Sequence, residues 1–154
     1  VHLINEYTSI VRDLDSHIVV RQFTSESSDR DAMLKDFANG SIDVLTSMKC
    51  LDEGVDVPRS ELAIFCASTG NPRQFIQRRG RVLRTHAEKK YAIIHDLVVI
   101  PDNNFDPSCQ DIEKNLVANE IRRVRDFAVL SENCNDTLNV LDDILEQYQI
   151  SLYN

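Results

Sequence analysis

Residues 18–47 decide the fold of this chain, and they read IVVRQFTSESSDRDAMLKDFANGSIDVLTS. The stretch begins with a short apolar run at 18–23 and ends with another at 42–46, and β-branched runs of this length are typical of buried strands. Between the runs, the S-x-x-D spacing at 28–31 is one by which a serine oxygen caps the start of a helix, and the Asn-Gly pair at 39–40 is a typical helix end. The stretch therefore predicts a strand, a capped helix and a second strand, which together form the repeating unit of a parallel sheet.

The same alternation continues on both sides of this stretch. Buried strands are expected at 62–66 and 91–95, because both runs are short and apolar. Helices are expected where apolar residues recur at helical spacing or where a proline opens the first turn, at 5–15, 72–83, 111–129 and 136–149. Because the strands are nearly all apolar, we expect an α/β fold with an open, mostly parallel sheet covered by helices on both faces, followed by a C-terminal helical tail.

The first of these helices has a clear apolar side. Tyr7, Ile10, Val11 and Leu14 follow one another at the spacing i, i+3, i+4 and i+7. This spacing lines one side of a helix and predicts an amphipathic helix at 5–15.

Length and composition are those of an ordinary globular domain. The chain has 154 residues, of which 42% are hydrophobic and 27% are charged, and it contains neither a signal peptide nor an apolar run of roughly 18 residues. We therefore expect a soluble, cytoplasmic protein with no membrane partner. The four cysteines form no C-x-x-C pair and the four histidines are scattered, so we expect reduced thiols and no metal site. Residues 1–100 are expected to form the main domain, and 101–154 a loop and helices that pack on it or extend it.

Charge is distributed unevenly along the chain. The net charge is −8, which by itself argues against a protein that simply coats nucleic acid. Residues 72–90, however, hold seven Lys or Arg against a single acidic residue, while the segments on either side are acidic. One short basic block therefore interrupts an acidic chain, and it is either a solvated helix face or a binding element.

A glycine, an aspartate and a proline follow the second expected strand, at 42–46, in the pattern G-x-D-x-P, as Gly54, Asp56 and Pro58. Glycine and proline fix a sharp backbone path, and the aspartate lies between two valines. Taken alone, the pattern also fits a turn in which Gly54 adopts a positive φ and Asp56 caps its own backbone.

The basic block contains the pattern Q-x-x-G-R-x-x-R, from Gln77 to Arg84. Arg81 and Arg84 are three residues apart, so they project from one face of a helix, and Gln77 lies on that face one turn earlier. Gly80 costs a helix about 1 kcal/mol relative to alanine, which suggests a close approach of backbone at that point. A planar guanidinium fits phosphate oxygens well. The other interpretation is that both arginines pair with surface carboxylates.

In this order and spacing, the two patterns resemble motifs V and VI of the superfamily 2 helicases and translocases. The resemblance covers roughly residues 5–100 and implies the second of two RecA-like motor domains. Residues 24–58 are similar to the run from motif IVa to motif V. Residues 81–84 and 91–96 are most similar to the branch that contains repair helicases and the motors of type I and type III restriction enzymes, and the last two helices look like the tail that often follows in that branch.

The resemblance also implies roles for individual residues. Arg81 and Arg84 match the arginine fingers that reach the γ-phosphate of ATP, and Gln77 matches the residue that ties motif VI to the nucleotide site. Gly54 and Asp56 match motif V positions near the sugar and phosphates of the nucleotide.

Four hydroxyl residues are candidate contacts to the nucleic-acid backbone. These are Thr24 and Ser25, by their loop position, and Thr46 and Ser47 at a strand end. Each can equally be an ordinary loop or strand-end hydroxyl. Where the family often has an Ala-Thr-Asp-like run in motif V, this chain reads Ser47-Met48-Lys49, so no contact is expected at Met48.

The chain lacks the parts of such a motor that hold the nucleotide phosphates and metal. It has no G-x-x-x-x-G-K-[ST] loop and no acidic box of the D-E-x-x type after an apolar strand. ATP with Mg²⁺ is therefore expected to be held mainly by an N-terminal RecA-like domain of the same parent protein, and this fragment alone is expected to be inactive. The absence of an initial Met also suggests a piece of a longer protein.

The partner implied by the resemblance is nucleic acid, with DNA favoured over RNA. A non-catalytic α/β module that docks protein or nucleic acid through its basic helix is the alternative. A phosphate-binding receiver-type regulator is a further one, although the expected strand-end loops hold mostly hydroxyls and not an acidic cluster.

Overall fold

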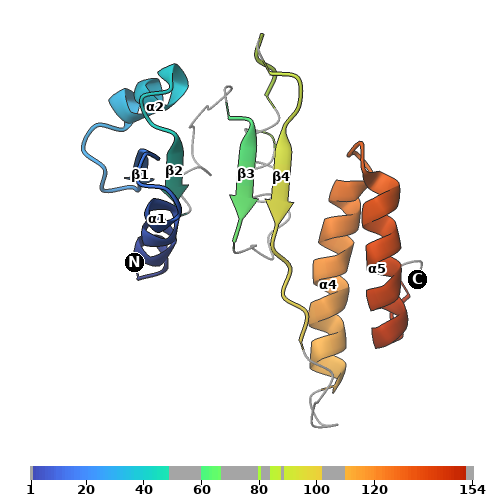
Figure 1. Ribbon diagram of the computed structural model, residues 1–154. Helices are drawn as coiled ribbons and strands as arrows, with labels where there is room; N and C mark the ends of the chain where they lie inside the picture. Colours follow the sequence, from blue (N-terminus) through green and yellow to red (C-terminus); the bar gives the residue numbers. More distant parts are fainter. Residues whose placement is uncertain are drawn as a thin grey trace. The chain divides into compact units, whose positions relative to one another are not determined.

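A computed structural model describes residues 2–48, 60–66, 80, 84–87, 89–101 and 110–151, and Figure 1 shows the arrangement of their helices and strands. The described residues fall into two compact units. The first contains those up to Ala63 together with those between 80 and 95, and the second contains 64–66, 96–101 and 110–151. The expected division at residue 100 remains a prediction. Among the described helices, none combines the length and the apolar character that a bilayer span requires.

The order of elements is that of an α/β fold. In chain order the elements are α1 (His2–Leu14), β1 (Val20–Phe23), α2 (Arg30–Asn39), β2 (Val44–Ser47), β3 (Leu62–Phe65), β4 (Ile93–Asp96), α4 (Gln110–Ala128) and α5 (Cys134–Tyr148). Each of these lies within three residues of an expected helix or strand. Gly80 is helical, and the rest of the helix expected at 72–83 lies outside the described residues.

β1 and β2 are parallel neighbours, as the strand–helix–strand pattern predicts. Val20 pairs with Val44 and Phe23 pairs with Ser47, so the two strands end at the same edge. On one face, fully buried Phe23 packs with Leu45 of β2 and with three apolar residues of α2, which are Met33, Leu34 and Phe37. This cluster is the core that α2 forms with the two strands.

The ends of α2 are capped, and one cap differs from the expected one. Asp29, not Ser28, is the N-cap: its carboxylate accepts a hydrogen bond from the backbone N–H of Ala32 at 3.1 Å. The helix therefore begins one residue later, where a charged acceptor also suits the positive end of the helix dipole. At the other end Gly40 has φ of +83°, a conformation that favours glycine, and this confirms the expected helix end.

α1 is amphipathic, but the side that is buried is not the one that carries most of the apolar residues. Ile4 and Thr8 are buried, whereas Ile10 is 55% and Leu14 77% exposed. On this buried side, Thr8 contacts two polar residues of the sheet, Gln22 of β1 and Thr46 of β2. A buried threonine on the helix therefore matches polar partners on the strands.

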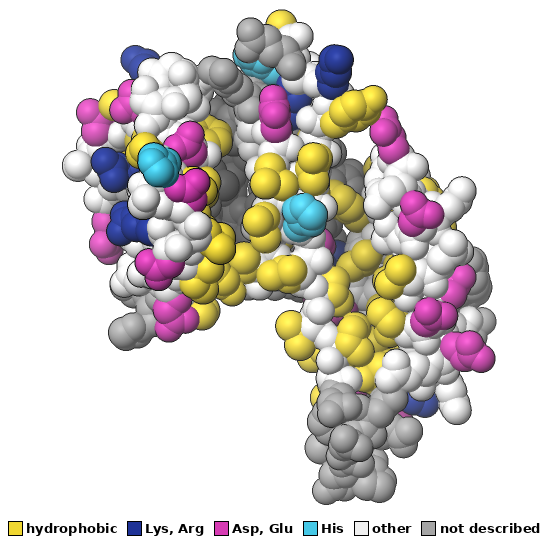
Figure 2. All heavy atoms as spheres, viewed as in Figure 1, with side chains coloured by type: hydrophobic (Ala, Val, Ile, Leu, Met, Phe, Trp, Pro, Cys, Tyr) yellow, Lys and Arg dark blue, Asp and Glu magenta, His cyan; other side chains and the backbone are white. Residues whose placement is uncertain are grey.

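β3 and β4 also form a two-stranded sheet, and their arrows run in the same direction in Figure 1. The backbone N–H of Ile93 donates to the carbonyl of Glu61 at 2.7 Å, and that of Leu97 donates to Phe65 at 3.0 Å. The expectation that these strands are buried is wrong for alternate residues, because Leu62, Ile64 and Ile93 are all more than half exposed. Figure 2 shows apolar side chains gathered over these two strands.

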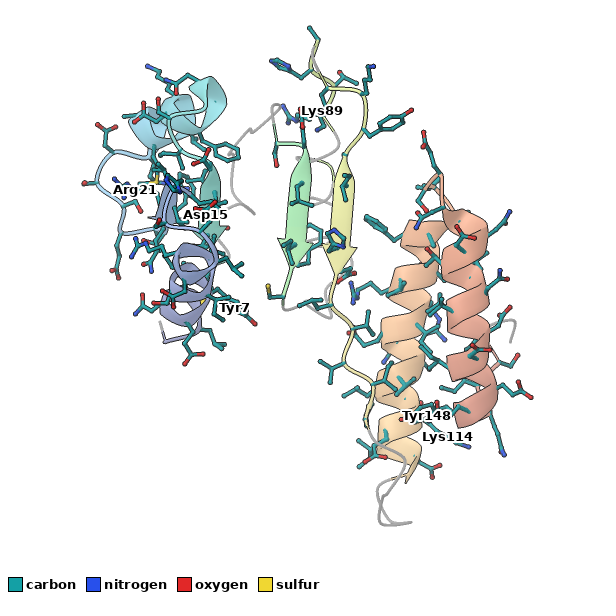
Figure 3. The ribbon with its side chains drawn as sticks, viewed as in Figure 1. Tyr7, Asp15, Arg21, Lys89, Lys114 and Tyr148 are labelled. Atoms are coloured by element: carbon teal, nitrogen blue, oxygen red, sulfur yellow. The ribbon has the colours of Figure 1, made fainter. Side chains whose placement is uncertain are left out.

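In the second unit, α4 and α5 lie side by side and form the expected helical tail (Figure 1). Its core is buried between the two helices and consists of Val117, Ile121, Leu141 and Tyr148. Tyr148, labelled in Figure 3, also donates a hydrogen bond from its hydroxyl to the carbonyl of Pro101. The tail is therefore joined to the segment that follows β4.

Candidate nucleotide and nucleic-acid site

The structure describes five of the nine expected site residues. These are Thr24, Ser25, Thr46, Ser47 and Arg84. Gly54, Asp56, Gln77 and Arg81 lie outside the described residues, and their roles remain predictions.

Three of the four hydroxyl residues meet at one edge of the β1–β2 pair. Phe23 pairs with Ser47, so Thr24 and Ser25 follow directly beside the end of β2. In open α/β sheets ligands bind at the carboxyl ends of the strands. Ser25 is exposed, and Thr24 and Ser47 are half-buried. The edge therefore carries hydroxyl groups within reach of a ligand.

The loop after β1 is held by a serine that the sequence analysis did not single out. The Ser27 hydroxyl accepts a hydrogen bond from the backbone N–H of Thr24 at 3.0 Å and donates to the carbonyl of Gln22 at 3.3 Å. The backbone N–H of Ser27 donates in turn to the Thr24 carbonyl at 3.2 Å. A serine three residues after the first residue of a loop is a recognisable turn signal, so Ser27 could have been found.

The side chains of Thr46 and Ser47 lie on opposite faces of the β1–β2 pair. Successive side chains of a strand point to opposite faces of a sheet, and the Thr46 hydroxyl lies 2.7 Å from the hydroxyl of Thr8 on α1. Thr46 is therefore directed at α1, while Ser47 shares the face of Phe23.

Arg84, the second expected arginine finger, is an exposed residue. Its backbone carbonyl accepts a hydrogen bond from Nζ of Lys89 at 3.0 Å, and the backbone N–H of Lys89 donates to His86 at 3.0 Å. Lys89, labelled in Figure 3, is thus hydrogen-bonded to the backbone carbonyls of both Arg84 and His86. Partial burial lowers the pKa of Lys89, and the carboxylate of Glu61 opposes this shift. No pattern in the sequence marked Lys89.

Within the described ranges, Cys66 and Cys134 are free thiols, and no three His, Cys, Asp or Glu side chains are grouped as metal ligands. The β1–β2 edge itself offers the hydroxyls of Thr24, Ser25 and Ser47 together with backbone amides. Both kinds of group donate hydrogen bonds to phosphate oxygens.

Comparison with protein families gives one decisive match. The model of the helicase conserved C-terminal domain matches residues 4–86, which is more than half of the chain. This chain belongs to the helicase C-terminal domain family. The matched span contains most of α1, all of β1, α2, β2 and β3, and both motifs from Gly54 to Arg84. It confirms the resemblance to superfamily 2.

Individual relatives agree with this assignment. The chain is 37% identical over 81 residues to the DNA 3'-5' translocase XPB2 of Sulfurisphaera tokodaii, a match that covers 53% of this chain and 18% of that protein. It is 31% identical over 86 residues to the putative ATP-dependent helicase IRC3 of Saccharomyces cerevisiae, covering 54% of this chain and 12% of that protein. The chain thus spans less than a fifth of the length of these helicase relatives.

Solved structures support the fold. Domain 2 of the DEAD-box helicase Mss116p, bound to an RNA duplex, is similar with a TM-score of 0.51 and 14% sequence identity, over 97% of this chain and 64% of that one. At this identity the likeness concerns the fold alone. It is that of the second RecA-like domain of helicases, as the sequence of elements predicts.

Proposed function

We propose that this chain is the second motor domain of an ATP-dependent superfamily 2 helicase or translocase. In this proposal Arg81 and Arg84 reach an ATP site that is shared with an N-terminal RecA-like domain of the same parent protein. The observation that carries the proposal is the family match over residues 4–86, because that span includes both motifs in their order.

The arginines would act on phosphate charge that develops during ATP hydrolysis. Guanidinium groups stabilise such charge, and an arginine finger accelerates phosphoryl transfer by about 10³–10⁵-fold. The exposure of Arg84 supports this role, because a finger has to leave its own domain to reach a nucleotide. Gln77 would tie this helix to the nucleotide, and Gly54 and Asp56 would lie near its sugar and phosphates.

ATP and its Mg²⁺ would be held mainly by the N-terminal domain. The chain has no G-x-x-x-x-G-K-[ST] loop to surround the phosphates. We infer that ATP draws the two domains together and that hydrolysis lets them separate. Repeated closing and opening would move the protein along nucleic acid.

Nucleic acid would bind at the strand edge formed by Thr24, Ser25 and Ser47. Hydroxyl donors there suit phosphate oxygens, which carry no base information. XPB2 is named a DNA translocase and the Mss116p domain is bound to RNA, and of the two we propose DNA for this chain. Comparing the affinities for DNA and RNA duplexes of equal length tests this choice.

The experiment that tests the proposal is ATP hydrolysis by the parent protein with the substitution Arg84→Ala. We expect nucleic-acid-stimulated turnover to fall by about 10³-fold or more while the fold is retained, since one finger is removed. Arg122→Ala is the matched control, because Arg122 is an exposed arginine of α4 far along the chain from both motifs.

Wild-type turnover in the Arg84→Ala protein would contradict the proposal. It would leave the chain as a docking module that uses its basic helix for binding alone. Circular dichroism of both variants excludes unfolding as the cause of any loss.

A further inference from the structure

The hydroxyl of Thr8 is buried and fully engaged. Thr8 is 1% exposed, and its hydroxyl donates to the carbonyl of Ile4 at 2.6 Å. The same oxygen lies 2.7 Å from the hydroxyl of Thr46 and 3.1 Å from Nε2 of Gln22. A threonine hydroxyl has one proton to donate and two lone pairs to accept with, so these three contacts use all of its capacity.

The direction of each hydrogen bond follows from this count. A carbonyl oxygen only accepts, so the proton of Thr8 goes to Ile4. Thr8 therefore accepts from Thr46, and Thr46 is the donor in the 2.7 Å contact. The carbonyl of Arg21 lies 3.5 Å from the Thr46 hydroxyl, which is too long to compete for the same proton.

Gln22 completes the cluster. Its amide nitrogen donates to Thr8 at 3.1 Å and to Oδ1 of Asn5 at 2.9 Å, so both of its N–H groups are used. Two residues of α1 and one residue on each of β1 and β2 are thus joined by directed hydrogen bonds. We call Asn5, Thr8, Gln22 and Thr46 the α1–sheet cluster.

The direction of the hydrogen bond between Thr46 and Thr8 decides which hydroxyl can bind a nucleic-acid phosphate. A phosphate of the nucleic-acid backbone only accepts hydrogen bonds, so a contact to it needs a donor. Thr46 has a single hydroxyl proton, and Thr8 takes it. We propose that Thr8 makes Thr46 a positioning residue of the β2 end and that the phosphate-contacting hydroxyl there is Ser47. This deepens the proposed function and rests on it for the identity of the ligand.

The first test measures binding of the 154-residue chain to a short DNA duplex at low salt. Ser47→Ala is expected to raise the Kd about tenfold, which is the size of one hydrogen bond to a charged acceptor. Thr46→Val, which keeps the shape and the strand preference, is expected to change the Kd less than twofold. Ser9→Ala, at an exposed serine of α1, is the control. A rise in Kd for Thr46→Val equal to that for Ser47→Ala overturns the assignment.

The second test examines the cluster without nucleic acid. Thr8→Val and Thr46→Val are each expected to raise the unfolding equilibrium constant about tenfold, because each leaves buried polar groups without a partner. Both substitutions remove the same hydrogen bond between Thr8 and Thr46. The unfolding constant of the double variant is therefore expected to rise clearly less than the product of the two single increases. Thr8→Ser, which keeps the hydroxyl, is expected to be as stable as the wild type.

Strict additivity of the two valine substitutions overturns the positioning role of Thr8. If instead the wild-type chain binds no DNA while the two substitutions prove coupled, the cluster stands and the nucleic-acid part of the proposed function fails. The two tests therefore separate the two claims.

Discussion

Asp96 and Arg123 form the most buried ion pair among the described residues, with side chains 11% and 9% exposed. The guanidinium of Arg123 donates to Asp96 and also to Glu120, one turn earlier on α4, at 2.7 Å. A charge that is removed from water needs an opposite charge nearby to offset its lost hydration. This pair therefore holds Asp96, at the end of β4, against α4 of the helical tail.

Removing the charge of Asp96 is expected to be costly. Asp96→Asn keeps the shape but leaves the buried guanidinium with less compensation, so we expect the free energy of unfolding to fall by about 3 kcal/mol. Urea denaturation of the chain measures this, with Asp126→Asn, at an exposed carboxylate of α4, as the control.

Replacing both members of the pair with apolar residues distinguishes charge from packing. The double variant Asp96→Leu with Arg123→Met is expected to be more stable than Asp96→Asn, because no buried charge is left alone. Equal or greater destabilisation of the double variant would show that the pair acts through packing.

At the scale of residues, the sequence predicted the positions of some site residues and gave no sign of others, and the reasons are physical. Thr24, Ser25 and Ser47 could be placed at one edge because parallel strands end together. The buried position of Thr8 could not be predicted, since nothing in a helical pattern shows whether a threonine within it is buried. Lys89 acts through the carbonyl of Arg84, and contacts to a backbone carbonyl leave no mark in sequence.

At the scale of elements, hydrophobic period and turn residues were sufficient to locate the helices and strands that the structure describes, while the helix expected at 72–83 remains a prediction. Burial was harder to predict. Whether Leu62 or Ile64 is covered depends on which other elements lie against β3, and the apolar run itself does not contain that information. For α1, the buried side includes Thr8, whose partners Gln22 and Thr46 lie on the strands and leave no mark in the sequence of the helix.

The start of α2 gives a prediction at this scale. Asp29→Ala is expected to lower the free energy of unfolding by about 1 kcal/mol, because the N-cap bond to Ala32 is lost. Ser28→Ala, the neighbouring substitution, is expected to change it by less than about 0.5 kcal/mol. Thermal unfolding of the two variants compares them directly. A larger loss of stability for Ser28→Ala than for Asp29→Ala would show that Ser28 is the N-cap.

At the scale of the whole molecule, net charge and local charge point to different conclusions. The chain carries −8 overall, yet seven basic residues lie within 72–90 around the proposed fingers. Local potential at a site depends on the nearest charges, since distant surface charges are screened within about 8 Å at physiological salt. The acidic remainder is therefore compatible with binding a triphosphate.

The division of labour between two domains is the central claim at this scale. The chain matches less than a fifth of the XPB2 and IRC3 relatives and carries no phosphate-binding loop. Guanidinium groups alone neither hold Mg²⁺ nor surround a triphosphate. In the proposed function, this domain therefore depends on its neighbour for hydrolysis.

The most direct measurement is ATP turnover by the purified 154-residue chain, with and without DNA. We expect none above the uncatalysed rate, and turnover that appears only when the N-terminal domain is added. Hydrolysis by the chain alone that is lost on Arg84→Ala would contradict the account, because a complete nucleotide site would then lie within this chain.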